Sequence, residues 1–200
     1  MERVKKRIFH YKNEYVKSVK LVHHDVATNR RYRLDIELKN GDNEKAVHLM
    51  MINPSKANEE ISDNTLNRII KYISLNNAAG VLQDIGKIII TNLYVVCETY
   101  PEKVDEYITV QSLDFVKGID ADGKYNNDTI IEMANKDAQL IIIAWGKGYI
   151  FDYDNRIQEI FRLIKNKEIY HMEDLTQEGY PRHPRTWAYS WKLKRYNIQG

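Results

Sequence analysis

Two short, uninterrupted apolar runs constrain the fold of this chain more than any other feature of its sequence. Residues 87–92 are KIIITN and residues 139–144 are QLIIIA. A strand that is apolar on both faces is expected where helices cover both faces of a parallel sheet. Segments with the apolar spacing of helices lie between such runs, so we predict an α/β protein.

The first part of the chain predicts an antiparallel meander. Residues 31–38 (RYRLDIEL) alternate clearly between apolar and polar side chains, as in a half-buried strand. Asn40-Gly41 is a turn signal, and residues 46–52 (AVHLMMI) are expected to form the next strand, which enters the core. Residues 1–45 are therefore expected to be an N-terminal antiparallel extension.

The second part alternates strands with helices. Strands are predicted at residues 46–52, 87–92, 139–144 and 168–172. The helices between them are predicted to end near residues 77, 137 and 166, with caps at Asp63 or Asn64, at Asn127 or Asp128, and at Asp154. This order predicts a central, mostly parallel sheet flanked by helices. We expect one α/β domain over residues 1–200, with a core at 46–187 and a basic aromatic tail at 188–200.

Cysteine content and apolar run lengths exclude several classes of protein. The 200 residues contain one cysteine, Cys97, which excludes an intrachain disulfide and a multi-cysteine zinc site and fits the reducing cytoplasm. The N-terminus has no apolar signal region, and no apolar run could span a bilayer, so no membrane association is expected. The histidines lack metal-ligand spacing and no phosphate loop is present, so no metal and no cofactor are expected. The sequence predicts no particular oligomeric state.

The charges are unevenly distributed. Residues 1–33 hold ten Lys/Arg and three Asp/Glu, and residues 181–200 hold five basic residues and no acid, although the net charge is only +2. If the two ends meet, they form a basic face that attracts nucleic acid or nucleotides. Residues 187–196 (WAYSWKLKRY) interleave aromatic and basic side chains, which suits single-stranded nucleic acid. The alternative interpretation is internal ion pairing, with the aromatic side chains of an amphipathic strand packed on one face.

Polar and aromatic side chains follow the predicted core strands. Ligands of open α/β sheets bind beyond the carboxyl ends of the strands. The amides of Asn53 and Asn92 donate and accept at once, which suits the edge of a nucleobase. Trp145 offers a stacking face, and His183 can donate to a developing anion. Further candidate substrate contacts in these segments are Pro54, Ser55, Tyr94, Gly146, Asn127 and Arg182.

Each of these side chains also has a structural interpretation. An Asn before Pro is a common way to end a strand, and Asn92 could bond to its own backbone. Trp145 could be a half-buried core residue, and His183 could be a structural residue between two prolines. No strong general base follows a strand; only Asp63 could supply one, from its loop.

The ordered motifs resemble a known family. The motifs are MINPS at 51–55, Asp63 with Thr65 and Arg68, TNLY at 91–94, Thr99 with Pro101, Gly123 with Asn127-Asp128, AWG at 144–146 and GYPRHP at 179–184. Together, over about residues 31–187, they resemble the domain-of-unknown-function family DUF1643. Asn64 stands where that family usually has proline, and Cys97 stands where it usually has arginine.

A more distant resemblance is to the uracil-DNA glycosylase superfamily. The segments INPS at 52–55, ITN at 90–92 and AWG at 144–146, and the final His-Pro, are similar to its motifs. The resemblance implies a three-layer sandwich in which Asn53 orients a water, Asn92 binds the base edge and His183 stabilises the leaving base. Such enzymes take the base out of its stack before acting. Ser55 and Arg185 depart from the usual motifs and could crowd a DNA backbone.

Three functions remain open from the sequence. The leading hypothesis is an enzyme that recognises a nucleotide or nucleobase and hydrolyses an N-glycosidic bond. The second is a module that binds or sequesters a nucleotide-derived signal without cutting it. The third is a nucleic-acid-binding accessory protein that uses its basic termini. The first two require a hollow at one edge of the sheet, enclosed by Asn53, Asn92, Trp145 and His183.

Overall fold

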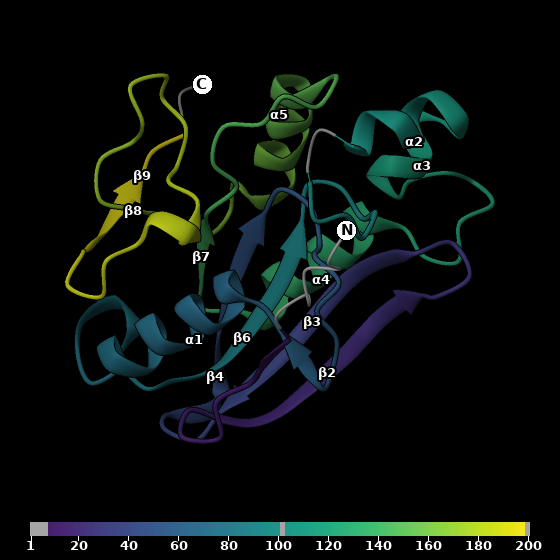
Figure 1. Ribbon diagram of the computed structural model, residues 1–200. Helices are drawn as coiled ribbons and strands as arrows, with labels where there is room; N and C mark the ends of the chain where they lie inside the picture. The colour runs from purple at the N-terminus through teal and green to yellow at the C-terminus, as the bar shows by residue number, and fades with distance from the viewer. Residues whose placement is uncertain (1–7, 101–102, 199–200) are drawn as a thin grey trace, which may run out of the picture.

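A seven-stranded sheet organises the chain in the computed structural model, which describes residues 8–100 and 103–198 (Figure 1). The strand order is β2-β3-β6-β4-β7-β8-β9. The strands are β2 (Val16–Asp25), β3 (Arg30–Leu38), β4 (Asp42–Met51), β6 (Ile85–Asn92), β7 (Leu140–Ile143), β8 (Ile169–Met172) and β9 (Leu193–Tyr196). Two short strands, β1 (Phe9–His10) and β5 (Ile61–Ser62), pair separately. The basic residues 1–7 and the motif residue Pro101 lie outside the described residues.

The sheet is mixed, so the prediction of an α/β protein is confirmed, whereas the prediction of a mostly parallel sheet is not. The inner strands β6, β4, β7 and β8 are parallel to one another. The outer pairings, β2 with β3, β3 with β6 and β8 with β9, are antiparallel. The two kinds of pairing are therefore equally common, because antiparallel strands extend the parallel centre on both sides.

The predicted N-terminal meander is wrong in one respect. β2 and β3 form the expected antiparallel pair, but β6 lies between β3 and β4. The turn at Asn40-Gly41 therefore does not close a hairpin. The apolar half of β4 is buried, and it gains parallel neighbours on both sides, β6 and β7. A strand apolar on both faces is more stable in the centre of a sheet than as the third strand of a meander.

Two glycines allow the starts of β4 and β6 to come close. A Cβ atom on Gly86 would lie 2.5 Å from the carbonyl carbon of Asp42, and a Cβ atom on Gly41 would collide with the backbone of Ile85. Gly41 also has a φ of 96°, which favours glycine. The amide of Asp42 donates to the carbonyl of Asp84 at 2.7 Å. This contact fixes the register in which the two strands begin.

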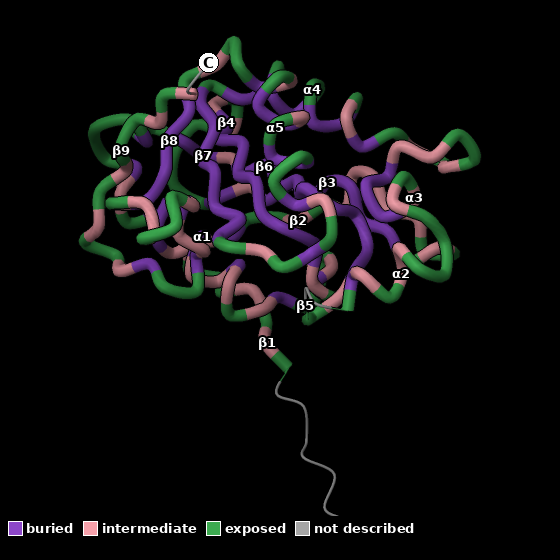
Figure 2. Tube along the Cα trace, turned by 90° about the horizontal axis from the view of Figure 1, so that it is seen from above, coloured by how far each residue is buried: buried purple, intermediate pink, exposed green. Residues whose placement is uncertain are grey.

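Helices cover both faces of the sheet (Figures 1 and 2). The α-helices are α1 (Asn64–Asn76), α2 (Val104–Val110), α3 (Leu113–Lys117), α4 (Asn127–Asp137) and α5 (Tyr153–Ile164). The apolar face of α1 packs with Leu49 and Ile90 on one side of the sheet. α5 and residue Ile131 of α4 pack with Ile141 and Ile143 on the other side. In Figure 2 the central strands are mostly buried between these two layers.

One of the three predicted helix caps is confirmed and two are shifted. α5 begins at Tyr153 after Asp152, so the predicted cap residue Asp154 lies inside its first turn. Asp63 caps α1 as predicted, because its side chain accepts a hydrogen bond from the amide of Leu66. α4 is capped by Asn126, one residue earlier than predicted. The short helices α2 and α3 were not predicted, because seven and five residues are too few to show a helical period. None of the helices in the described ranges has the length and apolar character needed to cross a bilayer.

The basic C-terminal tail is largely engaged in ion pairs. Lys194 lies 2.8 Å from a carboxylate oxygen of Asp174, and Arg195 lies 3.2 Å from one of Glu168. The described part of the tail contributes the edge strand β9 to the sheet. Trp187, which directly precedes the tail, is fully buried. These contacts favour the internal ion pairing that the charge pattern left open.

We expect the Gly86→Ala substitution to destabilise the protein by about 2–3 kcal/mol, because the added methyl group overlaps main-chain atoms that cannot move without breaking the β4–β6 register. Gly80→Ala is the matched control. Its site is open, so only its left-handed φ of 73° costs free energy, about 1 kcal/mol. Urea unfolding of both variants measures the difference, and equal destabilisation would contradict the proposed close approach.

Candidate functional site

A small polar cavity of about 100 Å³ lies beyond the carboxyl ends of β4 and β6. This volume is several times the volume that one water molecule needs. Four segments from three distant parts of the chain supply its polar lining: Asn53 and Ser55, Asp63 and Thr65, Glu98 and Thr99, and His183 and Arg185. The structure therefore brings Asn53, Ser55, Asp63 and His183 together, as the sequence predicted.

Main-chain hydrogen bonds hold the β4 side of the cavity. The pairing of β4 with β6 continues past the strands, because Tyr94 N donates to Ile52 O at 3.0 Å and Glu98 N donates to Pro54 O at 3.0 Å. Nδ2 of Asn53 donates to the carbonyl of Glu98 at 2.7 Å. Its Oδ1 has no partner among the described residues and can accept a hydrogen bond from a ligand or water.

His183 is held as a neutral hydrogen-bond donor. It precedes a short 3₁₀ helix (Pro184–Thr186), and its Nδ1 accepts a hydrogen bond from the amide of Arg185 at 3.2 Å. Burial, with the nearby Arg185 charge, lowers the pKa of His183 from 6.5 to about 4. A neutral ring that accepts at Nδ1 carries its proton on Nε2, so His183 offers an N–H group at neutral pH.

The loop that carries His183 is fixed from two sides. Gly146 lies against it: a Cβ atom at this position would be 3.0 Å from Cβ of His183, and its φ is 74°. On the other side, Arg68 of α1 donates to the carbonyl of Trp187 at 2.8 Å, and Trp187 Nε1 donates to the carbonyl of Arg182 at 3.0 Å. Gly146 and Arg68 therefore position His183 and do not line the cavity.

Asp63 joins the start of α1 to the loop after β4. Its Oδ1 accepts from the amide of Leu66 at 2.8 Å, and its Oδ2 accepts from the hydroxyl of Ser55 at 2.6 Å. A carboxylate oxygen can accept more than one hydrogen bond, so Asp63 retains acceptor capacity toward the cavity. Its negative charge also raises the pKa of His183, in opposition to the larger effect of burial.

Arg31 is a buried cation behind this site, and the sequence analysis did not identify it. Its Nη1 donates to the carbonyl of Ala57, whereas Nε and Nη2 have no partner among the described residues. Each of the other buried arginines has a carboxylate partner, namely Arg30 with Asp120, Arg33 with Asp35 and Arg156 with Asp128. Burial lowers the pKa of Arg31. The negative charge of Asp63 acts in the opposite direction and favours the protonated guanidinium. The only sequence signal was the unusual density of arginine in β3.

A larger, mostly apolar cavity of about 500 Å³ adjoins the polar one and shares Ser55, Asp63 and Thr99 with it. Its other walls include Phe9 of β1 and Ile61 of β5. Two exposed cations flank the two cavities, Lys56 on the apolar side and Arg185 on the polar side. Neither has a carboxylate within salt-bridge distance in the described ranges, so both are available to an anionic ligand.

Asn92 and Trp145 do not reach the cavity, so the predicted arrangement of four side chains around one hollow is wrong in this respect. Asn92 is 1% exposed inside the sheet, and its carbonyl accepts from Nδ2 of Asn127 at 3.1 Å. Trp145 is 2% exposed and packs edge-on against Phe161, with ring centroids 5.7 Å apart. Successive side chains of a strand point to opposite faces, so a position at the end of a strand does not by itself direct a side chain into the cavity.

The remaining predicted contacts have structural positions. Tyr94 and Asn127 are fully buried behind the site. Arg182 donates from Nε to the carbonyl of Asp174 at 2.8 Å, and its guanidinium lies over Trp191. Pro54 contributes its carbonyl to the pairing described above. None of these four residues lines the polar cavity.

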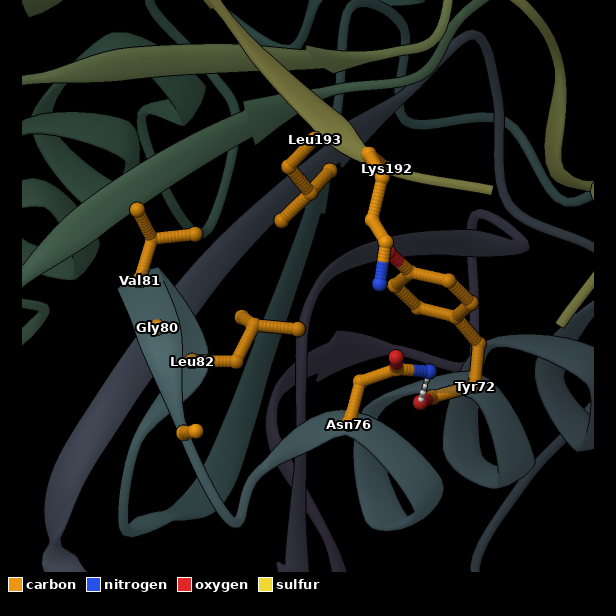
Figure 3. Close-up of a pocket in the computed structure, with 8 residues that line it drawn as sticks. Tyr72, Asn76, Gly80, Val81, Leu82, Lys192 and Leu193 are labelled. Atoms are coloured by element: carbon orange, nitrogen blue, oxygen red, sulfur yellow. Dashed lines mark hydrogen bonds between the residues drawn. The ribbon is translucent and has the colours of Figure 1, made fainter. Parts of the chain in front are cut away.

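A third hollow, of about 230 Å³, lies between the end of α1, the 3₁₀ helix Gly80–Leu82 and the start of β9. Figure 3 shows Lys192 pointing toward Tyr72 and Asn76. Two of its polar groups are engaged by carbonyls: Tyr72 donates to Trp191 O at 3.0 Å, and Asn76 donates to Tyr72 O at 2.9 Å. This hollow therefore presents fewer free polar groups than the cavity at His183.

Comparison with known proteins identifies one family. The family model described as "Protein of unknown function (DUF1643)" matches residues 31–185, more than three quarters of the chain. No curated protein and no solved structure matches. The resemblance to uracil-DNA glycosylases is thus not supported by these comparisons. Within the described ranges, no group of three His, Cys, Asp or Glu side chains is placed to hold a metal ion.

We expect the His183 ring to titrate with a pKa of about 4 and to carry its proton on Nε2 at pH 7. Because the folded pKa lies below 6.5, the unfolded chain binds this proton first. The contribution of His183 to stability therefore decreases as the pH falls from about 6.5 to about 4. Nitrogen-15 NMR of the imidazole, assigned with His183→Gln, measures both properties. A pKa near 6.5, or a proton on Nδ1, would contradict this description.

Proposed function

This chain belongs to the DUF1643 family, and we propose that it is a nucleotide-recognising hydrolase that cleaves an N-glycosidic bond. The observation that carries the proposal is the state of His183, a neutral ring whose Nδ1 is engaged and whose Nε2–H donates to none of the described residues. A leaving nucleobase develops negative charge on its ring nitrogens and on any exocyclic carbonyl oxygens. An N–H donor that is already held in place stabilises that charge through a hydrogen bond.

In the proposed reaction, the bond between the sugar C1′ and the base nitrogen breaks, and its electron pair leaves with the base. The oxygen of a water forms the new bond to C1′. Asn53 Oδ1 accepts from this water and orients it, and Asp63 takes the proton that the water loses. That proton then returns to the departed base, so the products are a free base and a sugar with a new hydroxyl group.

The dimensions of the two adjoining cavities support a nucleotide as the ligand. The polar cavity of about 100 Å³ takes the base beside His183, and the sugar lies across the shared wall at Ser55 and Thr99. Lys56 and Arg185, which pair with no carboxylate in the described part of the chain, are positioned to neutralise a phosphate. Trp145 has no stacking role in this arrangement, because it is buried elsewhere.

Two finer features belong to the same proposal. Helices on both faces of a sheet with four parallel central strands support a uracil-DNA-glycosylase-like sandwich. A single buried thiol, at Cys97, supports action in the reducing cytoplasm.

A second function, binding without cleavage, is favoured by the contacts of Asp63. Both of its carboxylate oxygens already accept hydrogen bonds, from Leu66 N and from Ser55 Oγ. Acceptor positions used for these two bonds are not available to take a proton from a water. The same pocket would then hold a nucleotide or nucleotide-derived signal intact.

We expect His183→Ala and Asn53→Ala to lower the release of free base by about 100-fold or more, because each removes one group that acts on the transition state. Chromatography of reactions with nucleoside monophosphates and with single- and double-stranded oligonucleotides measures release. His10→Gln is the matched control, because His10 is exposed and lines neither cavity. Circular dichroism verifies that the variants remain folded.

Two outcomes decide between the functions. Release at the wild-type rate by both variants would refute the assigned roles of His183 and Asn53. Recovery of an intact, tightly bound nucleotide from the wild type, with no free base from any substrate, would refute hydrolysis and support binding alone.

A further inference from the structure

A fourth cavity, of about 270 Å³, lies beside the carboxyl end of β7, and the proposed function does not use it. Its walls come from Trp145, just after β7, and from α5, the loop before His183, and β9. Four of its side chains are aromatic: Trp145, Phe161, Tyr180 and Tyr196. Two more are carboxylates, Asp154 and Glu178, and no Lys, Arg or His from the described residues lines it.

Three of the aromatic rings form one continuous wall. Trp145 packs edge-on against Phe161, with centroids 5.7 Å apart. Phe161 stacks on Tyr196, with centroids 5.3 Å apart and ring planes 13° apart. Tyr180 comes from the loop side and donates its hydroxyl to Asp154 at 2.8 Å. Aromatic faces attract cations, and cavities lined by several rings are used to recognise quaternary ammonium groups.

The carboxylates give this cavity a negative charge. Glu178 is paired with Lys147 at 3.1 Å, and this partner lowers the pKa of Glu178. Asp154 has no basic partner within salt-bridge distance in the described ranges. The charge of Asp154 is therefore available to a cationic ligand at the aromatic wall.

We propose that this cavity binds a small alkylammonium ligand. The ammonium group lies against the aromatic wall near Asp154. The site uses none of the residues assigned to base release, so it does not depend on the proposed hydrolysis.

We expect choline to bind with a dissociation constant of about 1 mM or tighter, measured by isothermal titration calorimetry. The neutral probe 3,3-dimethyl-1-butanol has the same shape and hydroxyl group but no charge, so it should bind at least about tenfold more weakly. Asp154→Asn and Tyr196→Leu should each weaken choline binding about tenfold, and Asp154→Asn should leave the affinity for the neutral alcohol unchanged.

Glu168→Gln is the control variant, because Glu168 pairs with Arg195 on the same edge of the sheet but does not line the cavity. It should bind choline as the wild type does. Asp154 is exposed, so its substitution should leave the core intact, which thermal unfolding verifies. No measurable choline binding, equal binding of the two probes, or unchanged choline affinity in Asp154→Asn would overturn the proposal.

Discussion

The structure depends on the main-chain pairing of β4 with β6, which continues beyond the ends of both strands. Hydrogen bonds from Tyr94 N to Ile52 O and from Glu98 N to Pro54 O carry this pairing into the loops. Each such bond contributes only about 1 kcal/mol on its own. Together they fix the backbone on both sides of Asn53, whose amide is then oriented by a further bond to the Glu98 carbonyl. The close approach at Gly41 and Gly86 sets this register at the opposite end of the same strands.

The second half of the site is brought to the first by α1. Asp63 caps this helix and also binds Ser55, so the start of the helix and the loop after β4 share one carboxylate. One turn further on, Arg68 holds the carbonyl of Trp187, and the loop before Trp187 carries His183. Gly146 lets that loop pack closely against the end of β7. The burial that results keeps His183 uncharged, so packing, and not only sequence, determines its chemistry.

The sequence predicted those features of the structure that depend on residues close to one another in the chain. The cap at Asp63, the buried strands and the meeting of Asn53 with His183 followed from capping chemistry, apolar patterning and the strand-end rule. The insertion of β6 between β3 and β4 was not predictable, because it results from long-range strand pairing. The burial of Trp145 and Asn92 was not predictable for the same reason, because it results from packing against Phe161 and Asn127, which lie far away in the sequence. Arg31 was missed because its lack of a carboxylate partner is a property of the packed structure.

The central claim is that the cavity between Asn53 and His183 is the place where a base is held. A crystal structure of the protein soaked with a panel of nucleoside monophosphates tests this most directly. The account predicts density for a base in the cavity, with one of its acceptor atoms within hydrogen-bond distance of His183 Nε2 and the phosphate near Lys56 or Arg185. Density for the nucleotide only at another surface, with the cavity holding water at saturating ligand, would contradict it.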